Sequence, residues 1–140
     1  MQITDVKGNL HNKGVLKVLT QSQYTPTEEK LRLLADKYEA DADIFVFACF
    51  NGETAVGIIA VKRLTAASFE ILSIAVETAS RGKGIGSKMI SFVAERFSCS
   101  HICAETDDDA VGFYRKFGFG IESLGEKYPG VIRYLCTLEL

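Results

Sequence analysis

Several features that this 140-residue sequence lacks argue against membrane, secreted and nucleic-acid-binding proteins. No apolar run approaches about 18 residues, so we expect no segment that spans a membrane. The first residues, MQITDVKGNL, lack the charged-then-apolar layout of a secretory signal. A formal net charge of −2 gives no broad electrostatic reason to bind nucleic acid. We therefore expect a cytoplasmic protein that binds neither a membrane nor nucleic acid.

Repeats, linkers and low-complexity segments are also missing, while 47% of the residues are apolar. This composition is typical of a folded globular protein and not of a disordered tail. A length of 140 residues fits one domain and is enough to bury a layered core. We predict a single domain over residues 1–140.

The four cysteines, Cys49, Cys99, Cys103 and Cys136, form no Cys-x-x-Cys pair. Cys99, His101 and Cys103 would share one face of a strand, so a metal site has to be weighed, but no fourth ligand is obvious. We expect reduced, mostly buried thiols, as in cytoplasmic proteins, and no bound metal.

Hydrophobic periodicity and turn residues predict alternating helices and strands. A helix is expected in TPTEEKLRLLADKYEA, with Thr25 as its N-cap, Pro26 at its first position and Glu28 completing a capping box. Asn51-Gly52, between IFVFACF and TAVGIIAVKRL, predicts a β-hairpin. Both faces of the next strand, Ser68–Val76, are largely apolar, so both should be covered.

The remaining segments complete a mixed α/β domain around a central sheet. DDDAVGFYRKF is expected to be a helix with its acidic residues at the start, where the helix dipole favours them. Another helix should follow the glycine-rich stretch described next. Further elements are expected at 2–6, in VLKVL, in HICAE, near 119–124 and at 131–139, with Tyr128-Pro129-Gly130 in the last loop.

The stretch RGKGIGSK, residues 81–88, lies between an apolar strand and an amphipathic helix. Backbone N–H groups at a helix start lack partners within the helix, and the helix dipole adds partial positive charge there. Glycines let a ligand approach the backbone closely. With Arg81, Lys83 and Lys88 as mobile countercharge, the stretch is suited to a phosphate-bearing ligand, and an ordinary glycine-rich turn is the alternative.

Two common phosphate motifs do not fit this stretch. The triphosphate loop requires Gly-x-x-x-x-Gly-Lys-Ser/Thr, and the dinucleotide fingerprint requires Gly-x-Gly-x-x-Gly, whose last position here is Ser87. The spacing present is Arg81-x-x-Gly84-x-Gly86.

This spacing, directly after ILSIAV, resembles the acetyl-CoA signature Gln/Arg-x-x-Gly-x-Gly/Ala of the GCN5-related N-acetyltransferase (GNAT) family. Downstream, DDDAVGFYRKFGF resembles the family's Asn-x-x-Ala-x-x-Phe-Tyr-x-x-x-Gly-Phe segment, with Asp107 where Asn is usual. The close match covers residues 68–119. The resemblance implies an α/β domain of the α+β type, with a mixed, mostly antiparallel sheet of about six to seven strands and about four helices.

The resemblance also implies acetyl-CoA as co-substrate. The amides of residues 82–87 would hold its pyrophosphate, and the strand end would pair with the pantetheine arm. Asp107 would contact that arm. The coenzyme-binding residues implied are Ile74, Ala75, Val76, Arg81, Gly82, Lys83, Gly84, Ile85, Gly86, Ser87 and Asp107.

The implied reaction is direct attack of a neutral primary amine on the acetyl carbonyl. Tyr114 is the candidate acid for the leaving thiolate, and the backbone amide of Ile74 or Val76 is the candidate oxyanion donor. Glu70, between Phe69 and Ile71, is the first candidate base, while Glu77 and a water chain remain alternatives.

The alternative to an enzyme is a non-catalytic acyl-CoA-binding sensor or regulatory subunit, which would keep the glycine loop but need no acid. The acceptor, a small-molecule or peptide amine, is not specified by any motif. Edge strands available for pairing could support a homodimer.

Overall fold

The computed structural model describes residues 1–23 and 26–140, which form one seven-stranded sheet, four α-helices and a short 3-10 helix. The predicted fold class is therefore confirmed. The helices are α1 (Lys13–Thr20), α2 (Glu28–Ala40), α3 (Ile85–Arg96) and α4 (Val111–Phe117), and the 3-10 helix η1 spans Thr78–Ser80. The strands are β1 (Gln2–Asp5), β2 (Ile44–Asn51), β3 (Thr54–Thr65), β4 (Ser68–Val76), β5 (His101–Asp107), β6 (Gly120–Tyr128) and β7 (Val131–Glu139).

The sheet has the strand order β1-β2-β3-β4-β5-β7-β6. Every neighbouring pair is antiparallel except β4 and β5, which are parallel. The parallel pair is connected through α3, as a parallel crossover requires. None of the helices among the described residues is long and apolar enough to cross a membrane.

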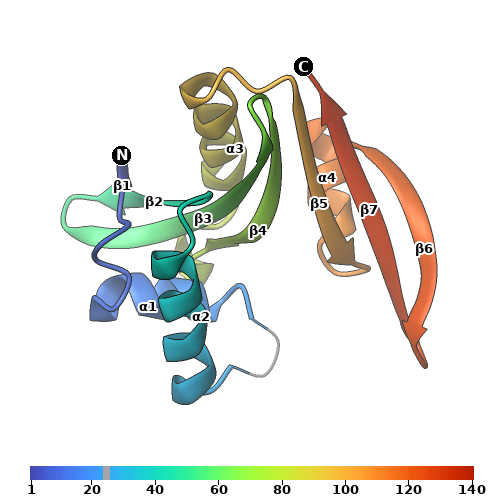
Figure 1. Cartoon of the computed structure of the whole chain (residues 1–140). Coiled ribbons are helices and arrows are strands. Elements are labelled where there is room, and N and C mark those ends of the chain that lie inside the picture. The colour runs from blue at the N-terminus through green and yellow to red at the C-terminus, as the bar shows by residue number, and fades with distance from the viewer. Residues whose placement is uncertain (24–25) are drawn as a thin grey trace.

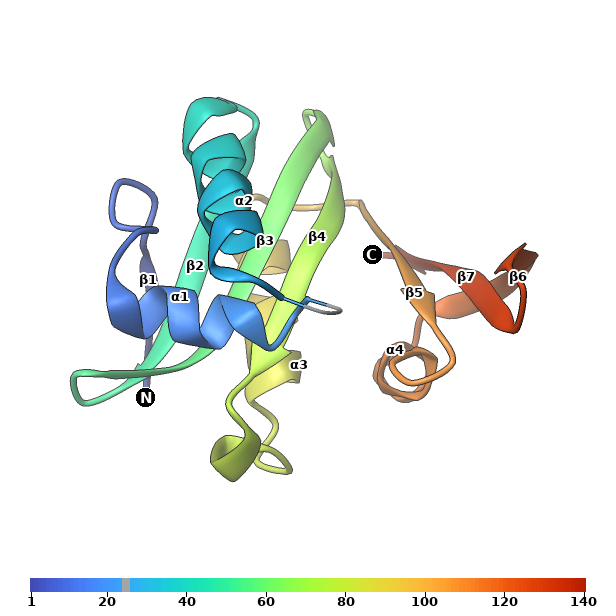
Figure 2. The ribbon, with the colours of Figure 1, turned by 90° about the horizontal axis from the view of Figure 1, so that it is seen from below.

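Helices cover both faces of the sheet (Figures 1 and 2). One buried cluster joins α3 and α4 to the sheet through residues such as Met89 and Tyr114. The other joins α1 and α2 to the opposite face through residues such as Leu19 and Tyr38. The expectation that both faces of β4 are covered is confirmed.

A bulge in β4 changes which side chains face which layer. Ala60 pairs with Ser73 and Val61 with Ile71, so Leu72 is the extra residue. Ile71 belongs to the core under α3, while Ala75 belongs to the core under α1 and α2. The bulge therefore switches the side-chain alternation halfway along β4.

The structure confirms the predicted hairpin of β2 and β3 but shifts its turn, and it corrects the boundaries of several other elements. The turn between β2 and β3 is formed by Gly52 and Glu53, because Asn51 pairs with Thr54. Gly52 has φ +63°, the left-handed conformation that a glycine at the first turn position adopts readily. The helix α2 begins at Glu28 with Thr27 as its N-cap, whose Oγ1 accepts from the Lys30 N–H.

The Thr25 cap predicted for α2 lies outside the described residues. Pro26 precedes the N-cap instead of occupying the first helical position, and the expected capping box is replaced by the Thr27 cap. Later in the chain, β6 extends to Tyr128, beyond the predicted 119–124, so the last turn is shorter than expected. The helix α4 begins only at Val111, and Asp107 ends β5.

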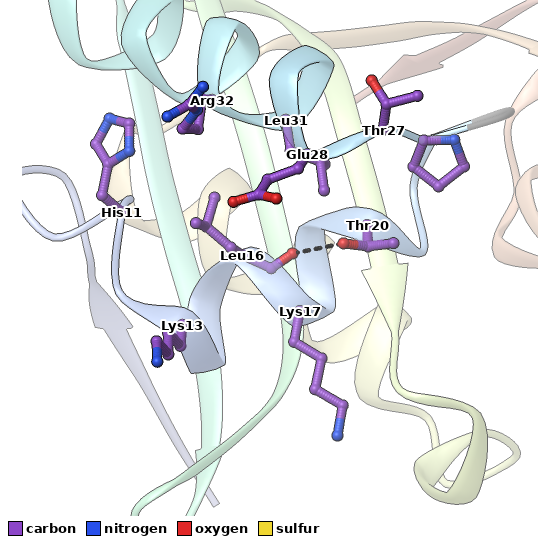
Figure 3. A pocket seen from close by; sticks show the side chains of 10 residues that line it. His11, Lys13, Leu16, Lys17, Thr20, Thr27, Glu28, Leu31 and Arg32 are labelled. Atoms are coloured by element: carbon purple, nitrogen blue, oxygen red, sulfur yellow. Dashed lines mark hydrogen bonds between the residues drawn. The ribbon is translucent and has the colours of Figure 1, made fainter.

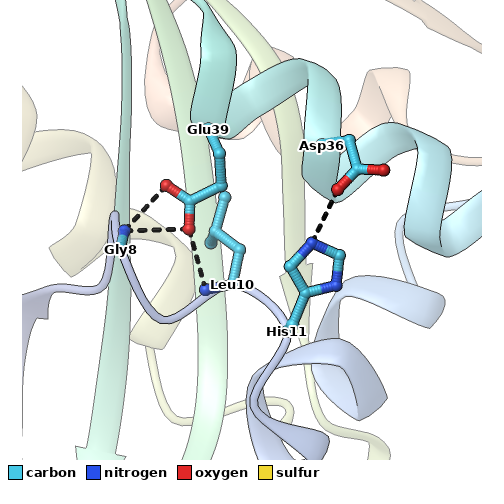
Figure 4. A network of polar contacts seen from close by, with 5 residues as sticks. All are labelled: Gly8, Leu10, His11, Asp36 and Glu39. Carbon is cyan, nitrogen blue, oxygen red and sulfur yellow. Dashed lines mark hydrogen bonds and ion pairs between the residues drawn. The ribbon is translucent and has the colours of Figure 1, made fainter.

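A polar network ties the N-terminal loop to α2 (Figure 4). The Glu39 carboxylate accepts from the Gly8 and Leu10 backbone N–H groups. Nearby, His11 Nε2 lies 2.8 Å from Asp36 Oδ1. These contacts fix the loop that leads into α1.

Candidate active site

The candidate site lies where β4 and β5 separate. These strands pair only from Ser68 with His101 to Ile71 with Ala104, and no pairing continues beyond in the described chain. A cavity of about 1050 Å³ occupies this region. It is lined by the later half of β4, the glycine-rich loop, the end of β5, α4 and the segment after α1.

The backbone of β4 presents polar groups to this cavity. Glu77 N–H donates to the Val56 carbonyl on β3. Because backbone groups alternate between the two edges of a strand, the N–H and C=O groups of Ile74 and Val76 face the opposite edge, toward β5. Ile74, Ala75 and Val76 all line the cavity.

The glycine-rich loop leads directly into α3. Gly82 and Gly84 have φ of +80° and +76°, and Gly84 is the N-cap of the helix. Among the described residues, no hydrogen bond uses the backbone N–H groups of residues 82–87. A Cβ at Gly82 or Gly84 would meet nothing within 4 Å, so the space beside the loop is open. These six N–H groups and the helix dipole can hold an anion.

Gly86 is needed for close packing and not for a left-handed backbone conformation. A Cβ there would lie 3.0 Å from Cε1 of Phe113 on α4. The missing side chain therefore lets α3 and α4 approach each other. The loop needs its glycines for backbone conformation at two positions and for packing at the third.

The three cationic side chains of the loop were expected to be mobile countercharges, but Arg81 is held by hydrogen bonds. Arg81 is not mobile, because its Nε donates to the Val76 carbonyl at 3.1 Å and its Nη2 donates to Gln21 Oε1 at 3.2 Å. Arg81 thus holds the end of β4 and the segment after α1 together. Arg81 lines the cavity, whereas Lys83 and Lys88 do not.

Tyr114 on α4 lies at the cavity, packed edge-to-face against Phe113 and Phe119. The tyrosine hydroxyls that form hydrogen bonds in the described part of the chain are those of Tyr38 and Tyr134, and not that of Tyr114. Burial raises the pKa of the phenol above its ordinary value of 10.0. The hydroxyl is therefore neutral and able to donate at any physiological pH.

Asp107 shapes the turn between β5 and α4. Its Oδ1 accepts from the backbone N–H groups of Asp109 and Ala110. The residue lines the cavity, as do Ile85 and Ser87 of the predicted coenzyme-binding set.

The two candidate bases lie outside the cavity lining. Glu70 is half-buried on β4 before the bulge, opposite Lys62 on β3 and Cys103 on β5. Glu77 follows β4 and accepts a hydrogen bond from Ser80 Oγ at 3.1 Å. The structure therefore groups Tyr114 with the glycine loop but not with either glutamate.

The family model of the acetyltransferase (GNAT) domain matches residues 41–121, more than half of the chain. This chain belongs to the GNAT family. No curated protein matches its sequence.

Solved GNAT-fold structures align with nearly the whole chain at low sequence identity. An aminoglycoside 6′-N-acetyltransferase from Enterococcus faecium has a TM-score of 0.81 at 15% identity, covering 99% of this chain and 97% of that one. The ribosomal-protein-S18-alanine N-acetyltransferase from Escherichia coli has a TM-score of 0.79 at 13% identity, with 99% and 92% covered. A GNAT acetyltransferase from Elizabethkingia anophelis with acetyl-CoA bound has a TM-score of 0.72 at 20% identity, with 99% and 97% covered.

Among the lining residues of the GNAT cavity that the sequence did not indicate, three are polar or charged side chains that contact one another or Arg81. Glu105 and Arg133 line it from β5 and β7, and Gln21 lines it from the end of α1. Arg133 Nε donates to Glu105 Oε1 at 3.2 Å, and Lys127 Nζ lies 3.4 Å from the same oxygen. These contacts lower the pKa of the Glu105 carboxyl.

The cysteines of this GNAT domain are all free. Burial raises the pKa of each thiol, and Cys99 lies before β5 rather than within it. Cys103 shares a face of β5 with His101, but Cys99 lies outside the strand, so the three side chains weighed from the sequence do not all share one strand face. No group of three or more metal-binding side chains occurs in residues 1–23 and 26–140.

A smaller hollow of about 480 Å³ lies between α1 and α2 (Figure 3). Leu16 and Leu31 line it together with the cationic side chains of Lys13, Lys17 and Arg32. It shares no lining residue with the larger cavity.

Proposed function

We propose that the protein is an N-acetyltransferase that moves an acetyl group from acetyl-CoA to a primary amine by direct attack in a ternary complex. The observation that carries the proposal is the run of six backbone N–H groups, residues 82–87, left without partners in the described chain beside an open cavity. Membership of the GNAT family and the acetyl-CoA bound in the similar structure from Elizabethkingia anophelis also support acetyl-CoA as the ligand of this loop.

The coenzyme would extend from the glycine loop along β4. The N–H groups of Gly82, Gly84 and Gly86 and their neighbours would bind the pyrophosphate at the start of α3. The outward-facing N–H and C=O groups of Ile74 and the N–H of Val76 would pair with the amide groups of the pantetheine arm, as a further strand would, while the Val76 carbonyl accepts from Arg81. Ala75 would line this path, and Asp107 would border the arm from β5.

The chemistry would need few side chains. The amine nitrogen forms a bond to the acetyl carbon, the carbon–sulfur bond breaks, and one amine proton ends on the sulfur of coenzyme A. An N–H of Ile74 or Val76 would donate to the oxyanion. Tyr114 would donate a hydrogen bond to the departing thiolate. Because its phenol is a weaker acid than a thiol of pKa about 8.5, we assign it a hydrogen bond and not complete proton transfer.

The base remains a choice between a glutamate and water. Glu70 and Glu77 do not line the cavity, so either would have to act through intervening water. The ammonium form of a lysine-like amine has a pKa of about 10.4 and must lose a proton before the nitrogen can attack. The mechanism therefore requires a base that takes this proton.

Calorimetric titration with acetyl-CoA tests the first half of the proposal. Gly84→Glu would put a carboxylate beside the phosphates and a side chain at φ +76°, so we expect it to abolish binding. Gly130→Glu is a matched control, because Gly130 also has φ +78° with open space around it and lies outside the cavity. Binding that is lost equally in both variants, or absent from the wild type, would overturn the coenzyme site.

Thiol release from acetyl-CoA in the presence of amines tests the second half. We expect amine-dependent release by the wild type and none by Gly84→Glu. Tight acetyl-CoA binding without release by any amine would instead identify a non-catalytic acyl-CoA-binding protein.

A further inference from the structure

One half of the cavity, which Tyr114 lines, lies on the face of the sheet that carries α3 and α4. Its second half lies on the opposite face. Ile102 and Ala104 of β5 and Cys136 of β7 pack in the core under α3 and α4. Side chains alternate along a strand, and the β5–β7 register is unbroken, so Glu105 and Arg133 face the opposite side. This is the face that carries α1 and α2, after which Gln21, Ser22 and Gln23 line the same cavity.

We propose that this half binds an acceptor amine that carries a free carboxylate, which the guanidinium of Arg133 recognises. The inference rests on the proposed function and names its substrate class. An amine entering here would approach the thioester through the gap between β4 and β5, opposite the face that holds Tyr114.

Arg133 has donors available for such a ligand. In the described part of the chain its side chain makes one polar contact, from Nε to Glu105, which leaves both Nη groups uncommitted. The side chain is 28% exposed and lines the cavity, so it is partly shielded yet reachable. A guanidinium held at Nε presents a planar edge that matches the two oxygens of a carboxylate.

Glu105 acts as a positioning residue for Arg133. Its hydrogen bonds to Arg133 and Lys127 keep the pKa of its carboxyl low, so it stays ionised at neutral pH and holds the guanidinium in place. Arg133 and Lys127 outnumber Glu105, but Asp107 lies opposite Arg133 in the β5–β7 register and lines the same cavity. The carboxylate would therefore be recognised by the uncommitted Nη donors of Arg133 and not by a net positive charge of the surrounding residues.

Matched acceptors separate carboxylate recognition from amine reactivity. Each of a set of amino acids and short lysine peptides is compared with its C-terminal amide, and lysine is compared with cadaverine, using thiol release from acetyl-CoA. We expect at least tenfold higher kcat/KM for the free carboxylate member of the preferred pair.

Arg133→Gln should then remove that preference by raising the KM of the carboxylate member at least tenfold. The KM for acetyl-CoA and the rate with the amide should change less than twofold. Arg96→Gln, the same substitution at an exposed position near the end of α3, is the control and should leave both members unchanged. Arg133→Lys should restore part of the preference for the carboxylate member, because lysine keeps the positive charge but lacks the paired N–H donors of the guanidinium.

The outcomes distinguish this inference from the proposed function. Equal or better turnover of the amides overturns carboxylate recognition and leaves the acetyltransferase intact. Equal loss for both members of each pair in Arg133→Gln shows a merely structural role and also overturns it. Thiol release from no amine at all overturns the proposed function and the inference together.

Discussion

At the scale of single residues, the Tyr114 hydroxyl is the most direct test of the chemistry. Tyr114→Phe removes an oxygen that takes part in none of the tyrosine hydroxyl hydrogen bonds of the described residues, which belong to Tyr38 and Tyr134, so the fold should persist. We expect turnover to fall at least tenfold, about 1.4 kcal/mol of transition-state stabilisation, while calorimetry shows unchanged acetyl-CoA binding. Tyr128→Phe, at a side chain 64% exposed, should have no effect. Unchanged turnover in Tyr114→Phe would remove the hydroxyl from the mechanism.

Glu70 can be tested as the base through the pH dependence of turnover. If it accepts the amine proton, Glu70→Gln should abolish the acidic limb of the plot of kcat/KM against pH, together with at least 90% of the activity. Glu77→Gln is the parallel variant, since Glu77 also lies outside the cavity. An acidic limb that survives in Glu70→Gln would exclude this residue.

Residue positions were predictable where a local motif fixes the backbone. Gly84 and Gly86 fall beside the cavity because strand, loop and helix follow each other directly in the chain. Lys83 does not line it, because spacing does not tell which way a loop side chain points. Glu105 and Arg133 were missed because their contact depends on the β5–β7 register, which joins segments far apart in sequence.

At the scale of elements, the contact between α3 and α4 depends on the absence of a side chain at Gly86. Gly86→Ala would bring a methyl group within 3.0 Å of the Phe113 ring. We expect a loss of about 1–3 kcal/mol in the free energy of unfolding, measured by urea titration.

Phe113→Leu combined with Gly86→Ala should recover part of that loss, because the smaller side chain makes room for the methyl group. A double variant whose loss equals the sum of the two single losses would show that the two positions are not coupled. That result would contradict close packing of α3 on α4.

Element boundaries were less predictable than element types. The sequence pattern predicts Thr25 as the N-cap of α2, because Pro26 and Glu28 then fit the first helical turn. The observed cap at Thr27 moves the first helical turn to Glu28, after Pro26. Similarly, β6 extends to Tyr128 because pairing with β7 continues across two register shifts that no local signal marks.

At the scale of the whole molecule, two buried clusters on opposite faces leave the separation of β4 and β5 between them. The sequence pattern predicted a mixed α/β domain around a central sheet, and the family resemblance added the mostly antiparallel strands and the number of helices. The order β5-β7-β6 could not follow from the sequence pattern, because strand order is set by long-range packing.

The four free thiols make a prediction about the stability of the whole domain. Burial raises the pKa of Cys49, Cys99, Cys103 and Cys136 above that of an unfolded thiol, about 8.5. Folding therefore favours the protonated thiols, and this stabilisation is complete below the unfolded pKa and is lost as pH rises through the folded values. The urea midpoint should be lower at pH 10 than at pH 7.

The same burial should suppress thiol chemistry at pH 8, since the thiolate is the reactive form. Native protein should react with a disulfide reagent at least tenfold more slowly than protein in urea, and Cys103, the half-buried thiol of the four, should react first. A Cys103→Ser variant should lack that first phase while keeping the other three slow. If all four thiols reacted in the native state as fast as in urea, the two buried clusters would not be closed to solvent, and the alkaline loss of stability would have no source in these residues.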